Sequence, residues 1–159
     1  MDSFWGPPQF THGGNPNLIS RVRLASSDSP LHAIIRGNSP DKFANVKLLI
    51  EKGTDLDHVD GRNSTPAMAA AMRGRYDIVL LLLEAGADFR VIPQPDESMR
   101  LIHLLVRQSS RPNGVSVQNQ PDFERVMKWL TDQGQSVDAA RADLKHWESL
   151  TGEEFGEKR

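Results

Sequence analysis

The chain contains no cysteine among its 159 residues, and aromatic side chains are scarce, with a single tyrosine. The absence of thiols excludes disulfides, zinc–sulfur centres and thiolate nucleophiles together. It leaves the compartment open, because a cysteine-free chain tolerates both oxidising and reducing surroundings. No apolar run approaches the roughly 18 residues that span a bilayer, so we expect no membrane insertion. The net charge of −2 gives no reason to expect nucleic acid as a partner.

The sequence motifs of common catalytic sites are missing as well. There is no Gly-x-Ser-x-Gly, no His-Glu-x-x-His, no P-loop and no glycine-rich dinucleotide turn. His58 and Asp60 flank one valine, but two ligands on a turn are too few to hold a metal ion. We therefore expect a protein that is not an enzyme, with no cofactor, no metal and no small-molecule substrate.

An internal repeat is the most informative feature that the sequence does contain. Ser29–Ala33 (Ser-Pro-Leu-His-Ala) precedes an apolar stretch that ends at Gly53. Thr65–Ala69 (Thr-Pro-Ala-Met-Ala) precedes a similar stretch that ends at Gly86, and the two glycines are 33 residues apart. A period of this length is typical of stacked helix pairs, each of which cannot bury its apolar face alone.

The two units resemble the ankyrin repeat in their Pro-containing opening, their leucine-rich second helix and the Gly-Ala-Asp ending at Gly86–Asp88. The match is strong over Asp60–Asp88, good over Ser29–Asp57 and partial over Glu97–Asp138. This resemblance implies an all-α fold, a short solenoid of about three stacked helix pairs with finger turns, an irregular N-terminal arm and a C-terminal capping helix. It also implies a protein partner, although fold alone does not identify that partner.

Turn and cap residues predict where the helices lie. Thr65 is an expected N-cap, Pro66 suits the first helical position, and glycines end the helices. By the same reasoning the capping helix covers Ala139–Leu150, with Trp147 buried against the helix of Trp129. The expected inner helices are Ser29–Asn38, Thr65–Arg73 and Met99–Arg107, and the expected outer helices are Phe43–Lys52, Tyr76–Ala85 and Phe123–Gln133.

The repeats are expected to occupy only the middle of the chain. Residues 1–27 are predicted to form an irregular arm with a short helix near Asn17–Leu24, residues 28–138 the repeats, and residues 139–159 the capping helix and tail. Phe4, Trp5 and Phe10 either pack over the first repeat or belong to a partner site. Residues 108–122 are rich in Ser, Pro, Asn, Gly and Gln, which predicts a loop inserted into the third repeat.

Arginine recurs at the ends of the three expected inner helices, as Arg36, Arg73 and Arg107. We align Arg73 with Arg107 and place Arg36 one position earlier. The resemblance puts such positions beside a concave face, where guanidinium groups suit an acidic partner, although a solvated row is the alternative. With the finger tips and the loop, the expected partner-binding residues are Arg36, His58, Asp60, Arg62, Met72, Arg73, Gln94, Asp96, Arg107 and Asn113.

Two function classes fit these observations. One is a dedicated module that binds and inhibits a single protein partner, and the other is an ankyrin scaffold or adaptor that tethers a partner without blocking it. The short array, the degenerate third unit and the loop inserted into that unit favour the dedicated module.

A further resemblance concerns the proline-aromatic opening, the Tyr-Asp-Ile-Val segment at Tyr76–Val79 and the segment Val126–Gly134. These resemble small bacterial ankyrin proteins, some of which are immunity partners of type VI secreted lipase effectors. The resemblance implies a toxin partner, a lipase-type effector whose active-site entrance is blocked. The sequence shows no secretory signal. We therefore expect the periplasm if a signal peptide has been removed from the sequence as given, and the cytoplasm otherwise.

Overall fold

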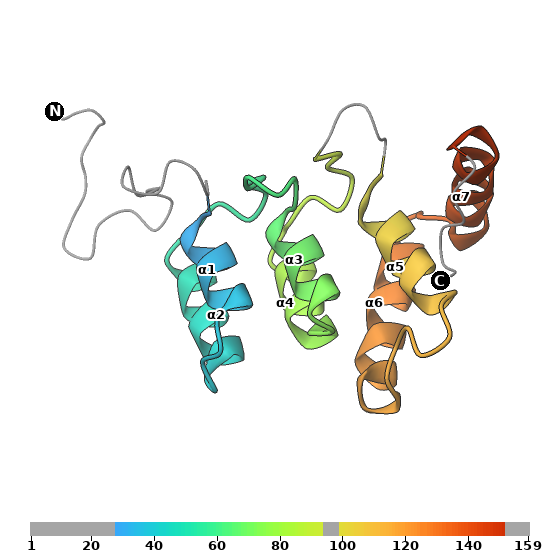
Figure 1. Cartoon of the computed structure of the whole chain (residues 1–159). Coiled ribbons are helices and arrows are strands. Elements are labelled where there is room, and N and C mark those ends of the chain that lie inside the picture. Colours follow the sequence, from blue (N-terminus) through green and yellow to red (C-terminus); the bar gives the residue numbers. More distant parts are fainter. Residues whose placement is uncertain (1–27, 94–98, 152–159) are drawn as a thin grey trace, which may run out of the picture.

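The structure is a computed structural model that describes residues 28–93 and 99–151 (Figure 1). This part of the chain forms seven α-helices and one short 3₁₀ helix, η2, and contains no strand, which confirms the expected all-α fold. The helices are α1 (Pro30–Arg36), α2 (Lys42–Glu51), α3 (Pro66–Met72), α4 (Tyr76–Glu84), α5 (Leu101–Ser109), α6 (Gln120–Asp132) and α7 (Val137–Thr151), with η2 at Val117–Asn119.

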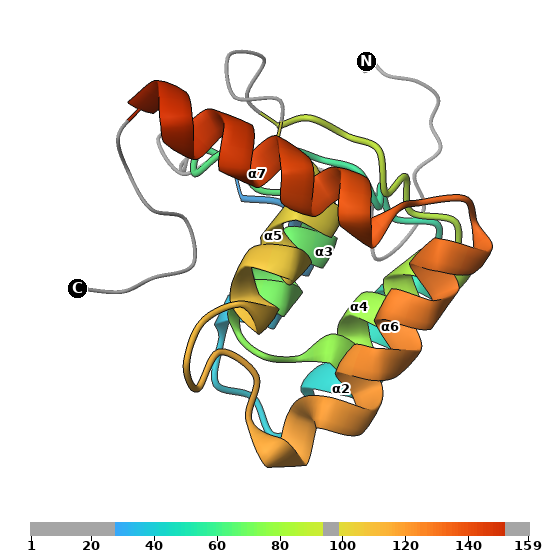
Figure 2. The same cartoon turned by 90° about the vertical axis from the view of Figure 1, so that its right-hand side faces the viewer.

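The first six helices form three antiparallel pairs that stand side by side (Figure 1). Helices α1, α3 and α5 make an inner row, while α2, α4 and α6 make an outer row, as the view along the stack shows (Figure 2). Helix α7 crosses α5 and packs against it, so it extends the inner row beyond the third pair. The described helices therefore build the predicted short solenoid, with α7 as its cap.

Caps and glycines set the helix boundaries as the sequence predicts. Ser29 and Thr65 are N-caps, and their hydroxyls accept hydrogen bonds from the backbone N–H groups of His32 and Met68. A proline follows each cap, where its missing N–H costs no helical hydrogen bond. Gly86 follows the end of α4 with φ of +108°, a conformation that glycine adopts without steric penalty.

The core runs along the stack between the two rows. Ala69, Ala70 and Ala71 of α3 are fully or almost fully buried, and their small size lets the neighbouring inner helices approach. In α4 the buried leucines are Leu82 and Leu83, while Leu81 is only half-buried. The row of repeats is thus held by one continuous apolar layer, as expected for a solenoid.

The third pair differs from the prediction at its loop. About half of the expected insertion at residues 108–122 is helical, because α5 continues to Ser109 and η2 leads directly into α6 at Gln120. Pro121 lies in the first turn of α6 and Asp122 is an acidic residue there, which are both helix-start signals that the polar composition obscured. Within the expected insertion, residues 110–116 are the part that lies outside helices.

The cap also packs differently from the prediction. Helix α7 begins two residues before the predicted capping helix. Trp147 was expected against the helix of Trp129, but its ring lies 4.9 Å from that of His103 in α5, and Trp129 instead meets Phe89. The cause is that α7 joins the inner row rather than the outer one. No helix within the described ranges is both long and apolar enough to cross a bilayer.

Two of the predicted regions lie outside the described residues. They are the N-terminal arm, which includes Phe4, Trp5, Phe10 and the helix expected at Asn17–Leu24, and the tail from residue 152 onward.

Candidate functional site

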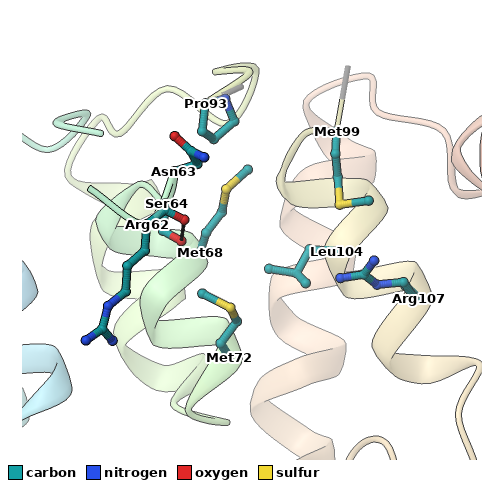
Figure 3. A pocket seen from close by; sticks show the side chains of 9 residues that line it. All are labelled: Arg62, Asn63, Ser64, Met68, Met72, Pro93, Met99, Leu104 and Arg107. Carbon is teal, nitrogen blue, oxygen red and sulfur yellow. Dashed lines mark hydrogen bonds between the residues drawn. The ribbon is translucent and has the colours of Figure 1, made fainter. Parts of the chain in front are cut away.

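The inner row carries a hollow of about 180 Å³ at the junction of the second and third repeats (Figure 3). One wall comes from α3 and from the turn at residues 60–64 that precedes it, which we call the finger. The other wall comes from α5 and the chain that leads into it. We call it the methionine hollow. Its lining residues are Arg62, Asn63, Ser64, Met68, Met72, Pro93, Met99, Leu104 and Arg107.

The inside of the methionine hollow is apolar and rich in thioether. Met68 and Leu104 are buried, Met99 is half-buried, and Met72 stands at the opening with 53% of its surface exposed. Figure 3 shows Met68 and Met72 on the α3 side, facing Met99 and Leu104 on the α5 side. Methionine is unbranched and polarisable, so such a lining adapts its shape to an inserted side chain.

The finger that forms the mouth of the hollow is held by one buried carboxylate. Asp60 Oδ1 accepts hydrogen bonds from the backbone N–H groups of Arg62 and Ser64, each at 2.9 Å. Asn63 takes the left-handed conformation with φ of +57°. Asn tolerates this conformation better than most residues, which allows the tight turn. These bonds fix where Arg62, Asn63 and Ser64 reach the hollow.

Asp60 is also the centre of an ionic network beneath the finger. It forms an ion pair with Arg36, which in turn pairs with Asp28 at 3.0 Å. The imidazole of His32 donates from Nε2 to the Ser64 carbonyl at 2.9 Å and accepts from the Ser29 hydroxyl at 2.8 Å. His32 of the first repeat is thus hydrogen-bonded to the backbone of the finger before α3.

The pKa values within this network are shifted by burial and hydrogen bonding. Burial lowers the pKa of His32 below its ordinary value, and the Ser64 hydrogen bond offsets only part of that effect. Burial raises the pKa of Asp60, but hydrogen bonds from Ser64, Arg36 and Arg62 outweigh it and hold the pKa below its ordinary value. The folded state therefore favours a neutral His32 beside an ionised Asp60.

This network changes the interpretation of three predicted partner-binding residues, Asp60, Arg36 and His58. Asp60 is 3% exposed, and only 12% of the Arg36 side chain is exposed. Both already have partners inside the first two repeats, so we assign them to holding the finger rather than to binding. His58 is half-buried, and its ring lies edge-on to that of His32 at 5.8 Å, which adds it to the same structural group.

The predicted register of the arginines was wrong by one position. The N-caps of the inner helices are Ser29, Thr65 and Arg100. Counted from them, the equivalent residues are Arg36, Met72 and Arg107. Arg73 falls one position later and does not line the hollow, although it is exposed. The error arose because α5 begins at an arginine N-cap, without the Thr-Pro signal that marks α3.

The remaining predicted residues do not meet at one place. Arg62, Met72 and Arg107 line the hollow. Asn113 is exposed in the segment between α5 and η2, with φ of +66°, and does not line it. Gln94 and Asp96 lie outside the described residues.

The set of predicted partner-binding residues did not include three apolar lining residues, Met68, Met99 and Leu104, and it named the finger tips without singling out Asn63, Ser64 or Pro93. The signal that could have found the site is the methionine distribution, because three of the five methionines line this hollow.

The chemistry of the methionine hollow suits recognition. Among the described residues that line it, the titratable groups are the two arginines, and neither is a general acid or base at neutral pH. Within residues 28–93 and 99–151, no three side chains of His, Cys, Asp or Glu come together as a metal site would require. A stacked helical solenoid with an apolar hollow at the junction of two repeats is typical of a protein-binding module.

Comparison with known proteins identifies the family. A family profile described as Ankyrin repeats (3 copies) matches residues 9–92, which is more than half of the chain. The chain therefore belongs to the ankyrin repeat family. The match also begins within the segment predicted as an irregular arm, and it ends before the third helix pair.

Two curated proteins show similarity over the repeats. An ankyrin repeat protein of Acanthamoeba polyphaga mimivirus is 31% identical over 79 residues, which cover 50% of this chain and 48% of the viral protein. The E3 ubiquitin-protein ligase XB3 of Oryza sativa subsp. japonica is 35% identical over 74 residues, or 46% of this chain and 16% of the ligase. The chain thus matches about half of the viral protein and a small part of the plant protein.

Proposed function

We propose that this chain is a dedicated binder of one protein partner, which it holds against the inner row at the junction of the second and third repeats. The observation that carries the proposal is the methionine hollow, where Met68, Met72, Met99 and Leu104 form an apolar pocket bordered by arginines. Binding energy in protein interfaces concentrates in a few central pockets of this kind. Surrounding polar residues mainly govern association rate and specificity.

The alternative is a scaffold that tethers a partner without blocking it. A scaffold needs no apolar pocket for one partner group, whereas the inner row carries the methionine hollow. This favours the dedicated binder. Inhibition of a secreted lipase-type toxin is a finer version of the same proposal, and it rests on the sequence resemblance alone. The relatives found are a viral and a plant protein, so they lend it no support.

Site-specific photo-crosslinking tests where the partner binds. A photoreactive amino acid replaces Met72 at the hollow, and a matched variant carries it at Leu48 on the outer row. These side chains are 53% and 51% exposed, so the two probes are equally accessible to solvent. In extract of the source cells we expect one dominant protein adduct from position 72 and none of the same mass from position 48.

Charge variants then test whether the adduct reflects specific binding. Arg107→Glu should weaken binding of the captured partner more than tenfold, because Arg107 lines the hollow. Arg73→Glu should have a smaller effect, because Arg73 lies outside it. Affinity is measured by calorimetry with the purified partner. An adduct that forms only from position 48, or equal losses for both variants, would move the binding site away from the hollow.

A further inference from the structure

The methionines of this chain are concentrated at one surface feature. Three of the five, Met68, Met72 and Met99, line the methionine hollow, although they come from two repeats. The remaining two are Met1, outside the described residues, and Met127, half-buried on α6 in the outer row. Core filling alone does not explain a residue with half of its surface exposed, as Met72 has. The cluster therefore indicates a surface into which a partner's side chain inserts.

The size of the hollow limits what it receives. Its volume is about 180 Å³. A closed protein cavity of about 150 Å³ holds one benzene molecule, so the hollow has room for one aromatic ring or one aliphatic side chain. Because Met72 stands at the opening, the inserted group enters from the exposed side of the inner row.

The chemistry of the lining favours a ring over an aliphatic chain. Thioether sulfur makes favourable contacts with aromatic rings, commonly at the ring edge, and here three sulfur atoms surround one space (Figure 3). The guanidinium of Arg107 lies beside Leu104 on the same wall and offers a cation to the ring face. An aliphatic side chain would gain burial but neither of these contacts.

The charges around the hollow select what flanks the ring. Helices α1, α3 and α5 contain no aspartate or glutamate, whereas the outer helices carry several, including Glu51, Glu84 and Asp132. Arg62 and Arg107 line the hollow itself, and Arg73 is exposed just after α3. Guanidinium groups bind carboxylates in a forked geometry. The described lining of the hollow contains arginine and no carboxylate, so it is complementary to an acidic chain.

We propose that the methionine hollow binds a single phenylalanine side chain, presented by a partner segment whose neighbouring residues are acidic. This inference rests on the proposed function and specifies the partner's chemistry at that site. The ring fills the space between Met68, Met72, Met99 and Leu104. A carboxylate next to it meets Arg107, whose guanidinium lies beside Leu104 (Figure 3).

Synthetic peptides test this without knowledge of the natural partner. The probe is an acetylated, amidated peptide of sequence Gly-Asp-Asp-Phe-Asp-Asp-Gly, compared with versions that have Ala or Leu at the centre or Ser in place of every Asp. The protein carries methyl-¹³C methionine, so that each methyl group gives its own NMR signal. We expect ring-current shifts at Met68, Met72 and Met99 with the Phe peptide, and none at Met127.

The expected affinities follow from burial and charge. The Phe peptide should bind at least about tenfold more tightly than the Ala peptide, since burial of the ring is their main difference. It should also bind more tightly than the Leu peptide. Replacement of the aspartates by serine should weaken binding and reduce its dependence on salt.

Matched variants assign the effect to the hollow. Met72→Ala should remove the preference for Phe over Ala, whereas Leu48→Ala, at a similarly exposed position, should leave it intact. Arg107→Gln should weaken binding of the aspartate peptide but not of the serine peptide, while Arg125→Gln, at an exposed position of α6, should change neither.

The outcomes separate this inference from the proposed function. Equal binding of the Phe, Leu and Ala peptides, or shifts at Met127 as large as those in the hollow, would overturn the aromatic site. Tighter binding of the serine peptide would overturn the acidic flanks. If crosslinking from position 72 still succeeds in those cases, the inner row binds a partner of different chemistry. If crosslinking fails while the peptides behave as expected, the hollow binds rings but the proposed partner surface is wrong.

Discussion

Removal of the buried carboxylate of Asp60 should destabilise the array more than removal of a surface carboxylate. Asp60 accepts two backbone hydrogen bonds and pairs with Arg36, at 3% exposure. Asp122, the matched control, forms an exposed pair with Arg125 at 3.4 Å. We compare Asp60→Ala and Asp60→Asn with Asp122→Asn.

The expected magnitudes follow from what each variant leaves behind. Asp60→Ala leaves two finger N–H groups without their acceptor and leaves the mostly buried Arg36 with Asp28 as its ion-pair partner. Loss of one member of a buried ion pair costs about 3–5 kcal/mol. Asp60→Asn keeps an oxygen acceptor for the finger but loses the charge, so it should cost about 1.5–3 kcal/mol. Asp122→Asn should cost less than about 1 kcal/mol, as is usual for an exposed pair.

The pH dependence gives the stricter test. The pKa of Asp60 is held below its ordinary value, so the ionised form is favoured in the folded state. The stability that it contributes is fully present above the unfolded pKa of about 3.9, and it is lost as pH falls through the lower folded pKa. The difference between the parent and Asp60→Asn should therefore be constant from pH 7 to about pH 5, and it should shrink below pH 4.

Urea unfolding followed by circular dichroism, at a series of pH values, measures these differences. The midpoint gives the change in stability as long as the slope is unchanged. If Asp60→Asn unfolds at the same urea concentration as the parent at pH 7, the carboxylate does not hold the finger. A difference that stays constant down to the acid transition would mean that the charge is not the cause.

Three further predictions concern the core, the segment after α5 and the histidine of the first repeat. Leu82→Ala should cost about 2–5 kcal/mol by urea unfolding, and the half-buried Leu81→Ala clearly less; equal costs would contradict the packing of α4. Gly114→Ala should lower the melting temperature more than Asn113→Ala, because a Cβ at Gly114 would lie 1.7 Å from the carbonyl oxygen of Gln108; a smaller effect would contradict that geometry. The lowered pKa of His32 favours its neutral form, so its contribution should be full above about pH 6.5 and decline as pH falls. His32→Gln should flatten the dependence of stability on pH between 8 and 5, and an unchanged slope would count against the buried neutral imidazole.

The first two helix pairs could be predicted from sequence because their signals are local. Ser29 and Thr65 cap their helices, prolines follow, and glycines such as Gly86 allow the positive φ that ends a helix. Each of these depends on the chain's own neighbouring atoms, so a single sequence is enough. The apolar second helix then identifies the buried face.

The third pair was harder because its helix starts use other means. Arg100 is the N-cap of α5, and its backbone N–H donates a hydrogen bond to the imidazole Nδ1 of His103 at 3.1 Å. No Ser, Thr, Asp or Asn marks this start, so the register of Arg107 was misplaced. The methionine hollow could not be predicted from the sequence for a related reason. It joins residues from two repeats, and only their stacking brings Met72 near Met99.

The methionine hollow belongs to a junction between repeats, and this has a thermodynamic consequence. On the outer row the same junction is closed by the Tyr76 and Phe123 rings, 5.1 Å apart. Gln108 of the inner row links the two rows there, because it accepts from the Tyr76 hydroxyl and donates to the α3 carbonyl of Ala71. A ligand that binds only the stacked form of the two repeats stabilises the contact between them. By reciprocity, the free energy of that contact contributes to the ligand's affinity. Substitutions at Tyr76 or Phe123 can therefore weaken recognition at a distance, without altering any atom that the partner touches.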